Sequence, residues 1–574
     1  MSVPATQFAT PDRFHPADGT GTLIRPVVFD GHLGWLHLPA GPSRREAGVL
    51  LVAPPGRDGR CVYRPLRDLA EQLARAGFPT LRFDLRGVGD SLDPEDDGDI
   101  WPVWLEGVAA AAELLKTTTE VSRLVLGGVR LGASLAASAG VENDGLILLA
   151  PVVSGRQWLR ELKLAGAMSG TGAPEGSMAM EADGLHLSAA TATGLGTLDL
   201  TRLETTPVRA LVAAHSASSA TIGERLAGLG CAVSASDFPG YEALLDDTHS
   251  NRAPQELFAR IAAWLDEAFP RRVPQEVIAL HLAAEPVAMH PPGAIEHPVH
   301  FGPGLSGVLC LPEGAVSDGR AVIFCNTSGE PRAGIGRFAV QAARELARHG
   351  VASLRFDFAG IGDSDGEGPI HIYSIPRTGD FAAAVSLLAA EGFPEVSVMA
   401  VCSGAFHALR ALIADPRIGG AFTVSAKLVW RAGEGLAPEM KDEGKATGAY
   451  VQGLKDPATW RRLLTGRIDV RAVLRTLSQR MAARVSARLN DDDGRALREG
   501  LAQVAERGGR AHLLMGLDDA SLDELETYFG GKAAKLTGMI GMSYRVDPGL
   551  DHGLSRRDSR EIALKDLLAF VGAD

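Results

Sequence analysis

The sequence predicts an α/β protein made of two similar halves, each a mostly parallel sheet with helices on both faces. Three observations predict this class. One block of residues recurs about half a chain away, strand-like and helix-like segments alternate within each half, and a sharp strand-to-helix turn follows one buried strand. Strands that alternate with helices are typical of parallel sheets, because each crossover helix covers a face of the sheet.

The recurring block is a glycine-rich segment that follows a short apolar strand. Leu81-Arg-Phe-Asp-Leu-Arg-Gly-Val-Gly-Asp-Ser91 returns as Leu354-Arg-Phe-Asp-Phe-Ala-Gly-Ile-Gly-Asp-Ser364, with an offset of 355 − 82 = 273 residues. Upstream, residues 25–41 and 297–314 share a pattern of two strands. An internal repeat indicates one fold present twice, and 574 residues are too many for one ordinary core.

The elements of the second half follow from hydrophobic patterning. Apolar runs predict strands over 320–324, 351–356 and 396–401, and helical spacing predicts helices over 336–349, 379–390 and 559–571. The glycines after the second strand lack the Lys-Ser/Thr of a phosphate loop, so we interpret them as a turn.

The domain boundary is predicted in a proline-rich stretch. We expect an N-terminal tail over 1–21, a first domain over 22–270, a linker over 271–295 and a second domain over 296–574. Each domain holds an insertion before its last strands, a candidate cap over about 153–203 and about 430–507.

The strand-to-helix turn is centred on Cys402. The strand over 396–401 leads into it, a helix follows, and Ala400 and Gly404 are the small residues two before and two after. Small flanks at a sharp turn predict a nucleophile elbow with Cys402 as the nucleophile. If Ser403 were the centre, one flank would be the β-branched Val401. A buried packing cysteine is the alternative.

Both halves resemble α/β-hydrolases of the serine-aminopeptidase type, and more narrowly the hydrolases found with exosortase A and bacterial exopolysaccharide systems. The resemblance implies two tandem α/β-hydrolase domains, each with an inserted cap. It is carried by the two repeated blocks and by Pro54-Pro-Gly, Asn326-Thr-Ser-Gly, Gly334-Ile-Gly-Arg337, Gly128-Val-Arg-Leu-Gly132 and Val401-Cys-Ser-Gly-Ala405.

In this fold the acid and the base follow the nucleophile along the chain. Residues 511–519 form a predicted strand that ends in Gly516 and two carboxylates. The acid of the fold usually lies three residues after such a glycine, which favours Asp519 and leaves Asp518 as the alternative. His552 lies between the last predicted strand and the last helix, where the general base belongs.

An acyl-transfer site also needs donors for the developing oxyanion. One is predicted to be the backbone N–H of Ser403, directly after the nucleophile. The other is expected from the loop over 325–329, where we favour the N–H of Thr327 and consider the Asn326 side chain as a further donor.

The first half has lost this chemistry. The elbow position is Arg130, since 402 − 272 = 130, and a guanidinium that stays protonated cannot be a nucleophile. No carboxylate follows the strand at 208–214, and only His249 is left of the triad. Arg130 could hold an anion or pair with a carboxylate such as Asp84.

Composition narrows the partners. A net charge of −13 argues against nucleic acid, and no apolar run is long enough to be stably inserted in a membrane. The five scattered cysteines lack metal-ligand spacing, so we expect no metal and no cofactor. No signal peptide is visible, which together with the unpaired cysteines predicts a cytoplasmic protein.

The sequence therefore predicts a tandem hydrolase that acts on a small-molecule ester, thioester or other acyl donor. Cys402, His552 and Asp519 would form the triad of the second domain, and the first domain would be a pseudo-hydrolase. The halves would form a pseudo-dimer within one chain, which could also form homo-oligomers. An acyltransferase with a sugar or amine acceptor and a non-catalytic binding or scaffold protein are the alternatives.

Overall fold

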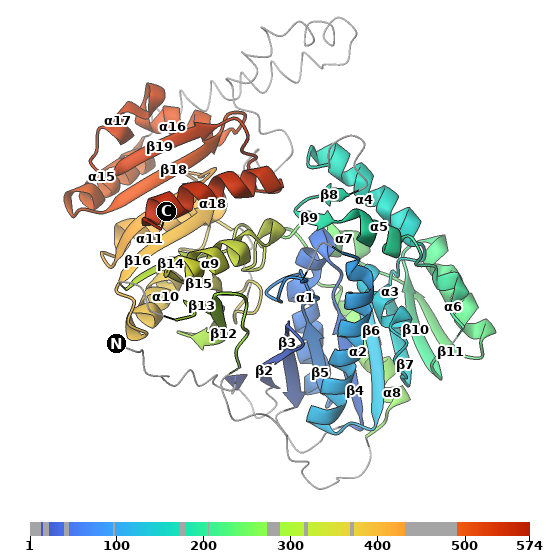
Figure 1. The fold of residues 1–574 in the computed structure, drawn as a ribbon. Helices are drawn as coiled ribbons and strands as arrows, with labels where there is room; N and C mark the ends of the chain where they lie inside the picture. Colours follow the sequence, from blue (N-terminus) through green and yellow to red (C-terminus); the bar gives the residue numbers. More distant parts are fainter. Residues whose placement is uncertain are drawn as a thin grey trace, which may run out of the picture.

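Two α/β domains of the same strand order make up the described part of the chain (Figure 1). The computed structural model describes residues 13–14, 22–39, 45–95, 98–172, 179–204, 206–271, 287–314, 319–367, 372–430 and 491–573. The predicted linker at 271–295 lies mostly outside these residues, as does most of the second cap predicted over about 430–507, of which residues 431–490 are not described.

The first domain is organised around a sheet of order β1-β2-β3-β5-β4-β6-β7-β10-β11. Its strands from β5 to β11 are parallel, and β2 and β3 form an antiparallel hairpin at one edge. The strands are β1 Arg13–Phe14, β2 Thr22–Phe29, β3 His32–Pro39, β4 Ala47–Val52, β5 Thr80–Phe83, β6 Arg123–Val129, β7 Gly145–Leu149, β10 Arg209–Ala214 and β11 Ala232–Asp237. The helices are α1 Gly56–Arg75, α2 Ile100–Thr119, α3 Leu131–Ser138, α6 Ala217–Gly228, α7 Tyr241–Leu245 and α8 Gln255–Ala268.

The predicted first cap corresponds to elements between β7 and β10. A small hairpin and short helices lie at this end of the domain, beside the second domain (Figure 1). They are α4 Gly155–Ser169, β8 Met180–Ala182, β9 Leu185–Leu187, α5 Ala189–Leu195 and the 3₁₀ turn η1 Leu200–Arg202.

The second domain repeats the strand order, as β12-β13-β15-β14-β16-β17-β18-β19. The strands are β12 Ala294–Phe301, β13 Leu305–Pro312, β14 Arg320–Phe324, β15 Ala352–Asp357, β16 Glu395–Val401, β17 Ile418–Val424, β18 Arg510–Gly516 and β19 Met542–Asp547. The helices are α9 Phe338–Arg348, α10 Thr378–Ala390, α11 Ser403–Ala414, α15 Asp492–Glu506, α16 Ser521–Phe529, α17 Ala534–Thr537 and α18 Arg557–Val571, with 3₁₀ turns η2 Ile335–Arg337 and η4 Gly531–Ala533.

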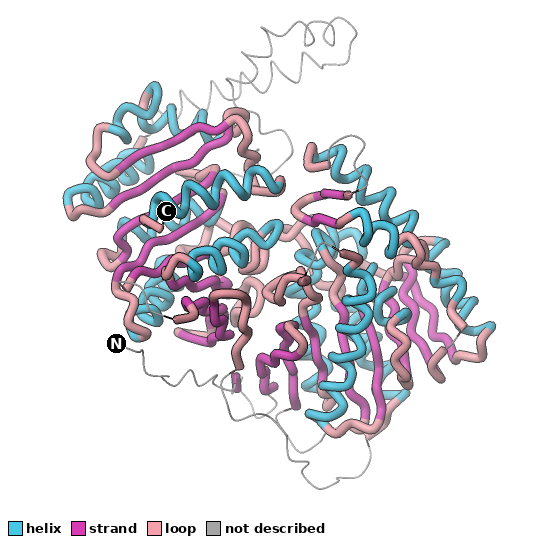
Figure 2. The backbone as a smooth tube through the Cα atoms, viewed as in Figure 1, coloured by secondary structure: helices cyan, strands magenta, loops and turns pink. Residues whose placement is uncertain are grey.

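The predicted fold class is confirmed, because two mostly parallel sheets each carry helices on both faces (Figure 2). Each sheet has a buried apolar cluster on either side, so both domains have a complete core. The helix expected over 336–349 begins later, at Phe338, because Gly336 and Arg337 have φ of 59° and 58° and interrupt it.

The two repeated blocks meet each other where the domains join. Arg355 of the second block bonds Asp90 of the first at 3.0 Å, and Arg82 of the first block pairs with Asp363 of the second. Since 82 + 273 = 355 and 90 + 273 = 363, the contacts are reciprocal, as at an interface with twofold symmetry. All four side chains are buried, so the two similar blocks also join the two domains.

Candidate active site

The turn at Cys402 has the strained backbone of an elbow. Cys402 lies between β16 and α11 with φ 50° and ψ −114°, a conformation that non-glycine residues rarely adopt. Its N–H donates to the Val424 carbonyl at 2.9 Å, and a Cβ on Gly404 would lie 2.6 Å from the Asn326 carbonyl oxygen. A small residue is therefore needed two positions after Cys402, as the sequence pattern suggested.

A buried carboxylate orients a histidine close by. Asp519 follows β18, and its Oδ2 lies 3.0 Å from Nδ1 of His552. Its Oδ1 accepts the N–H and the hydroxyl of Ser521 at 2.8 and 2.7 Å. Burial disfavours the ionised carboxyl, but His552 and these hydrogen bonds outweigh it and lower the pKa of Asp519 to about 2. Asp518, the alternative acid, is exposed.

The other ring nitrogen of His552 is directed to the side of Cys402. Both residues line one small cavity, and Nε2 is buried with no hydrogen-bond partner among the described residues. Burial disfavours the imidazolium, but Asp519 and then Cys402 outweigh it and raise the pKa of His552 well above its usual value. The arrangement can remove a proton from the thiol and keep it on the ring.

The two predicted oxyanion donors come from adjacent segments. Ser403 is the first residue of α11, and Thr327 lies in the loop after β14. Neither backbone N–H is engaged among the hydrogen bonds of the described residues. The segments are tied together, because Ser328 N–H donates to Ser403 Oγ at 2.7 Å and Thr327 Oγ1 donates to the Val401 carbonyl at 3.2 Å.

Asn326 is not available as a further oxyanion donor, which corrects our expectation. Its amide nitrogen donates to the Glu330 carbonyl and to Asp357 Oδ1, each at 2.8 Å. Its Oδ1 accepts the N–H of Phe358 at 2.6 Å. All of these bonds are buried, so Asn326 shapes the loop instead of facing a substrate.

In the first domain an elbow of the same shape carries Arg130. Its φ of 52° and ψ of −123° match those of Cys402, and its N–H donates to the Leu149 carbonyl at 2.9 Å. The guanidinium lies 3.3 Å from both Asp58 and Glu161. Asp84 is not its partner, which corrects the pairing we considered.

The acid position of the first domain can be read from the strand register. Leu514 pairs in register with Val424, whose carbonyl accepts the Cys402 N–H. Ala213 pairs in the same way with Leu149, whose carbonyl accepts the Arg130 N–H, so Leu514 and Ala213 are equivalent positions. Asp519 lies 519 − 514 = 5 residues further on, and 213 + 5 gives Ser218, which is exposed. The remaining histidine, His249, contacts Asp247 at 2.9 Å and faces no nucleophile in the elbow.

A contact that the sequence did not predict joins the first domain to the Thr327 loop. Glu330, at the end of that loop, accepts a hydrogen bond from Thr248 at 3.1 Å and pairs with Arg60 at 2.7 Å. Gly329 lies directly against the Thr248 carbonyl. No local pattern could reveal this contact, because it depends on how the two domains pack.

The strand order and the elbows define two α/β-hydrolase-like domains. No known family model matches the chain, and no curated protein matches it. Among solved structures, the Pyrococcus furiosus esterase Pf2001 aligns at 14% identity and TM-score 0.30, covering 49% of this chain and 92% of its own. Est1E from Butyrivibrio proteoclasticus, with bound ferulic acid, aligns at 17% and 0.31, covering 42% and 98%. Likeness at these scores carries no information about activity.

Two negative findings hold for the described residues. No group of three or more His, Cys, Asp or Glu side chains there is placed to hold a metal ion. None of the helices that the structure describes has the length and apolar character needed to cross a membrane.

Proposed function

We propose that the second domain is an acyl-transfer enzyme, an ester or thioester hydrolase that works through a cysteinyl-acyl intermediate. Cys402 is the nucleophile, His552 the general base and Asp519 the residue that orients the base. The observation that carries the proposal is the strained turn at Cys402. This residue lines the same cavity as His552, whose Nδ1 lies 3.0 Å from Oδ2 of the buried Asp519 carboxylate.

The reaction uses these groups in sequence. His552 Nε2 accepts the thiol proton while Sγ of Cys402 attacks the acyl carbon, and the carbonyl oxygen becomes an oxyanion. The N–H groups of Ser403 and Thr327 stabilise that charge. The leaving alcohol or thiol takes the proton from His552, which leaves the acyl group on sulfur. Water, deprotonated by His552, then attacks the thioester, releasing the acid and restoring the thiol.

The first domain is, in this proposal, the inactive copy of a duplicated hydrolase. Arg130 and Ser218 replace two of the three catalytic groups. The first domain supports the site of the second domain, because Thr248 and Arg60 hold Glu330 next to the oxyanion loop. The narrower kinship to hydrolases of exopolysaccharide systems rests on the sequence motifs alone, and a cytoplasmic location rests on the scattered cysteines.

Thiol reactivity tests the nucleophile. Burial raises the pKa of Cys61 and of Cys310 to about 12 and also raises that of Cys325, so these thiols stay protonated near neutral pH. Iodoacetamide should therefore alkylate Cys402 first, as read by peptide mapping, and His552→Ala should slow it. Equal labelling of all the cysteines, or labelling that His552→Ala leaves unchanged, would favour a non-catalytic scaffold.

The acceptor is tested by partitioning. The catalytic groups are the same for water, sugars and amines, because the thioester forms before the acceptor reacts. An activated ester is supplied with rising concentrations of hydroxyl or amine acceptors, and free acid is measured against acylated acceptor. If free acid is the main product at every acceptor concentration, the hydrolase proposal is supported. If the acylated acceptor is the main product, the enzyme is an acyltransferase instead.

A further inference from the structure

Two equivalent carboxylates, one in each repeated block, have different surroundings. Asp357 and Asp84 are 273 residues apart, and each accepts the N–H of the aspartate six residues later. Asp357 accepts three more hydrogen bonds, from the Asn326 amide, the Arg332 N–H and the Arg332 guanidinium, each at 2.8 Å. Its four acceptor sites are thus occupied by the chain itself.

Asp84 lacks these three partners. Its Oδ2 accepts the Asp90 N–H at 2.9 Å, and no hydrogen bond to its Oδ1 occurs among the described residues. At the same offset of 273, Ala53 stands where the second domain has Asn326. Asp84 is nevertheless buried, with 8% of its surface exposed.

The guanidinium partner is missing because the first domain has a shorter loop. Arg67 of α1 and Arg344 of α9 are equivalent, because each donates to the serine carbonyl of the other domain's block. Their offset is 344 − 67 = 277, four more than 273. The first domain therefore lacks four residues between strand and helix, in the segment where the second domain has Arg332.

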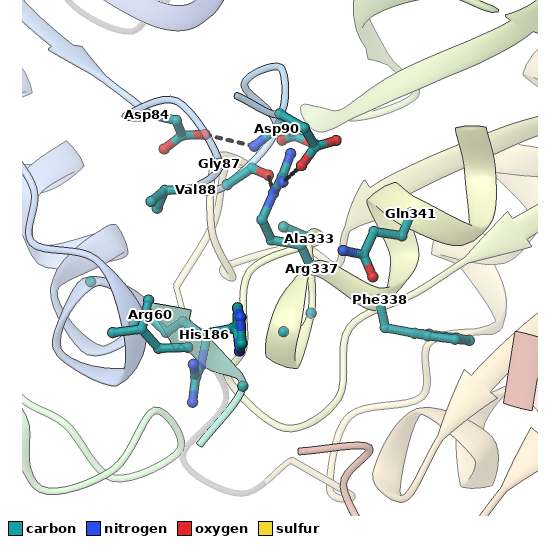
Figure 3. A pocket seen from close by; sticks show the side chains of 18 of the residues that line it. Arg60, Asp84, Gly87, Val88, Asp90, His186, Ala333, Arg337, Phe338 and Gln341 are labelled. Carbon is teal, nitrogen blue, oxygen red and sulfur yellow. Dashed lines mark hydrogen bonds and ion pairs between the residues drawn. The ribbon is translucent and has the colours of Figure 1, made fainter. Parts of the chain in front are cut away.

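A cavity of about 490 Å³ lies beside Asp84, between the two domains. In Figure 3, Asp84 and Val88 line it from the first domain, and Arg337, Phe338 and Gln341 line it from the second. The apolar side chains of Ile100 and Trp104 line the same cavity. The volume is that of a pocket for a small organic molecule.

The charges around the cavity leave Asp84 without a cation of its own. Arg332 is shared by Asp90, Asp357 and Asp363, and Arg337 pairs with Asp93. Burial and the Asp90 carboxylate raise the pKa of Asp84 to about 7. A buried carboxylate with a single hydrogen-bond donor and no paired cation is destabilising, and a bound cation would relieve this.

We propose that this cavity binds an organic cation with several N–H donors on an apolar body, such as an amidine, a guanidine or a primary amine. Its cationic group takes the place that the Arg332 guanidinium and the Asn326 amide hold beside Asp357. Its apolar body packs on Val88, Ile100 and Trp104. The site is separate from Cys402 and does not depend on the proposed reaction.

Three probes of one shape test the charge preference: benzamidine, benzamide and benzoate, titrated calorimetrically into the full chain. Benzamidine should bind saturably, and more tightly than neutral benzamide. Benzoate should not bind, because the arginines at the cavity are already paired. Equal binding of benzamide, tighter binding of benzoate, or no saturable benzamidine binding in the millimolar range would overturn the proposal.

Three variants then locate the probe. Asp84→Asn keeps the acceptor for the Asp90 N–H but removes the charge, and should weaken benzamidine binding about tenfold, the value of a hydrogen bond to a charged group. Ala53→Asn supplies the amide present in the other domain and should weaken binding as well. Glu561→Gln removes an exposed carboxylate from the same cavity and should leave binding unchanged. Unaltered affinity in both Asp84→Asn and Ala53→Asn would overturn the assignment.

Discussion

The contact between the first domain and the oxyanion loop gives a sharp test, the substitution Gly329→Ala. A Cβ at this position would lie 2.0 Å from the Thr248 carbonyl oxygen and 2.7 Å from its carbon. Ordinary contact begins at 3.4 Å, so the two backbones must separate by 3.4 − 2.0 = 1.4 Å. Both are main chain, so neither can turn aside as a side chain would.

The displacement reaches the proposed donor directly. Thr327 lies two residues before Gly329, in the same loop. Misplacing a catalytic group by about 1 Å costs about 100-fold in rate, and loss of one oxyanion donor costs about 100- to 1,000-fold. We therefore expect acylation of Cys402 to slow about 100-fold.

Two reactions of the same thiol separate this effect from general damage. Acylation by p-nitrophenyl acetate passes through an oxyanion and is followed as a burst of p-nitrophenolate. Alkylation by iodoacetamide forms no oxyanion and should keep its rate. Gly379→Ala is the matched control, because a Cβ there meets open space. Unchanged acylation in Gly329→Ala, or an equal loss of both reactions, would refute the reasoning.

Three further predictions concern the triad, the inactive elbow and the domain interface. Asp519→Asn removes the charge that raises the pKa of His552, so the pKa of His552 should fall in an NMR titration, and an unmoved pKa would contradict this. In the unsubstituted protein this pairing stabilises the fold below the unfolded pKa of about 6.5, and the stabilisation is lost as pH rises through the raised folded pKa. Asp519→Asn should abolish that pH dependence of stability. The double variant Cys402→Ala, Arg130→Ser should have no turnover, because no carboxylate orients a base in the first domain, and measurable hydrolysis would show that account to be wrong. Arg82→Met removes one of the two arginines that pair with the buried Asp363 carboxylate and leaves Arg332, so it should lower the free energy of unfolding by about 1.5–3 kcal/mol in urea titrations, while a loss typical of exposed pairs, under about 1 kcal/mol, would mean that the Arg82 pair is not buried in solution.

The sequence by itself determined the class of fold and the elbow. Strand and helix patterns depend on neighbouring residues, so their alternation predicts a parallel sheet without knowledge of distant contacts. The turn at Cys402 could be recognised from its small flanks alone, although the backbone that crowds Gly404 is that of Asn326, which is distant in the sequence. The repeated block could be recognised for the same reason.

The tertiary structure decided the surroundings of residues that lie next to each other in the sequence. Asp518 and Asp519 are adjacent carboxylates, and only the fold shows that Asp519 is buried against His552. The hydrogen bond from Thr248 to Glu330 joins residues 82 positions apart in the sequence. Asp84 lacks the hydrogen-bond donors of Asp357 because the loop between strand and helix in the first domain is four residues shorter, and the cavity beside it is closed by the second domain. Such contacts arise only when the domains pack, because the groups that meet are brought together by the whole fold and not by their neighbours in the chain.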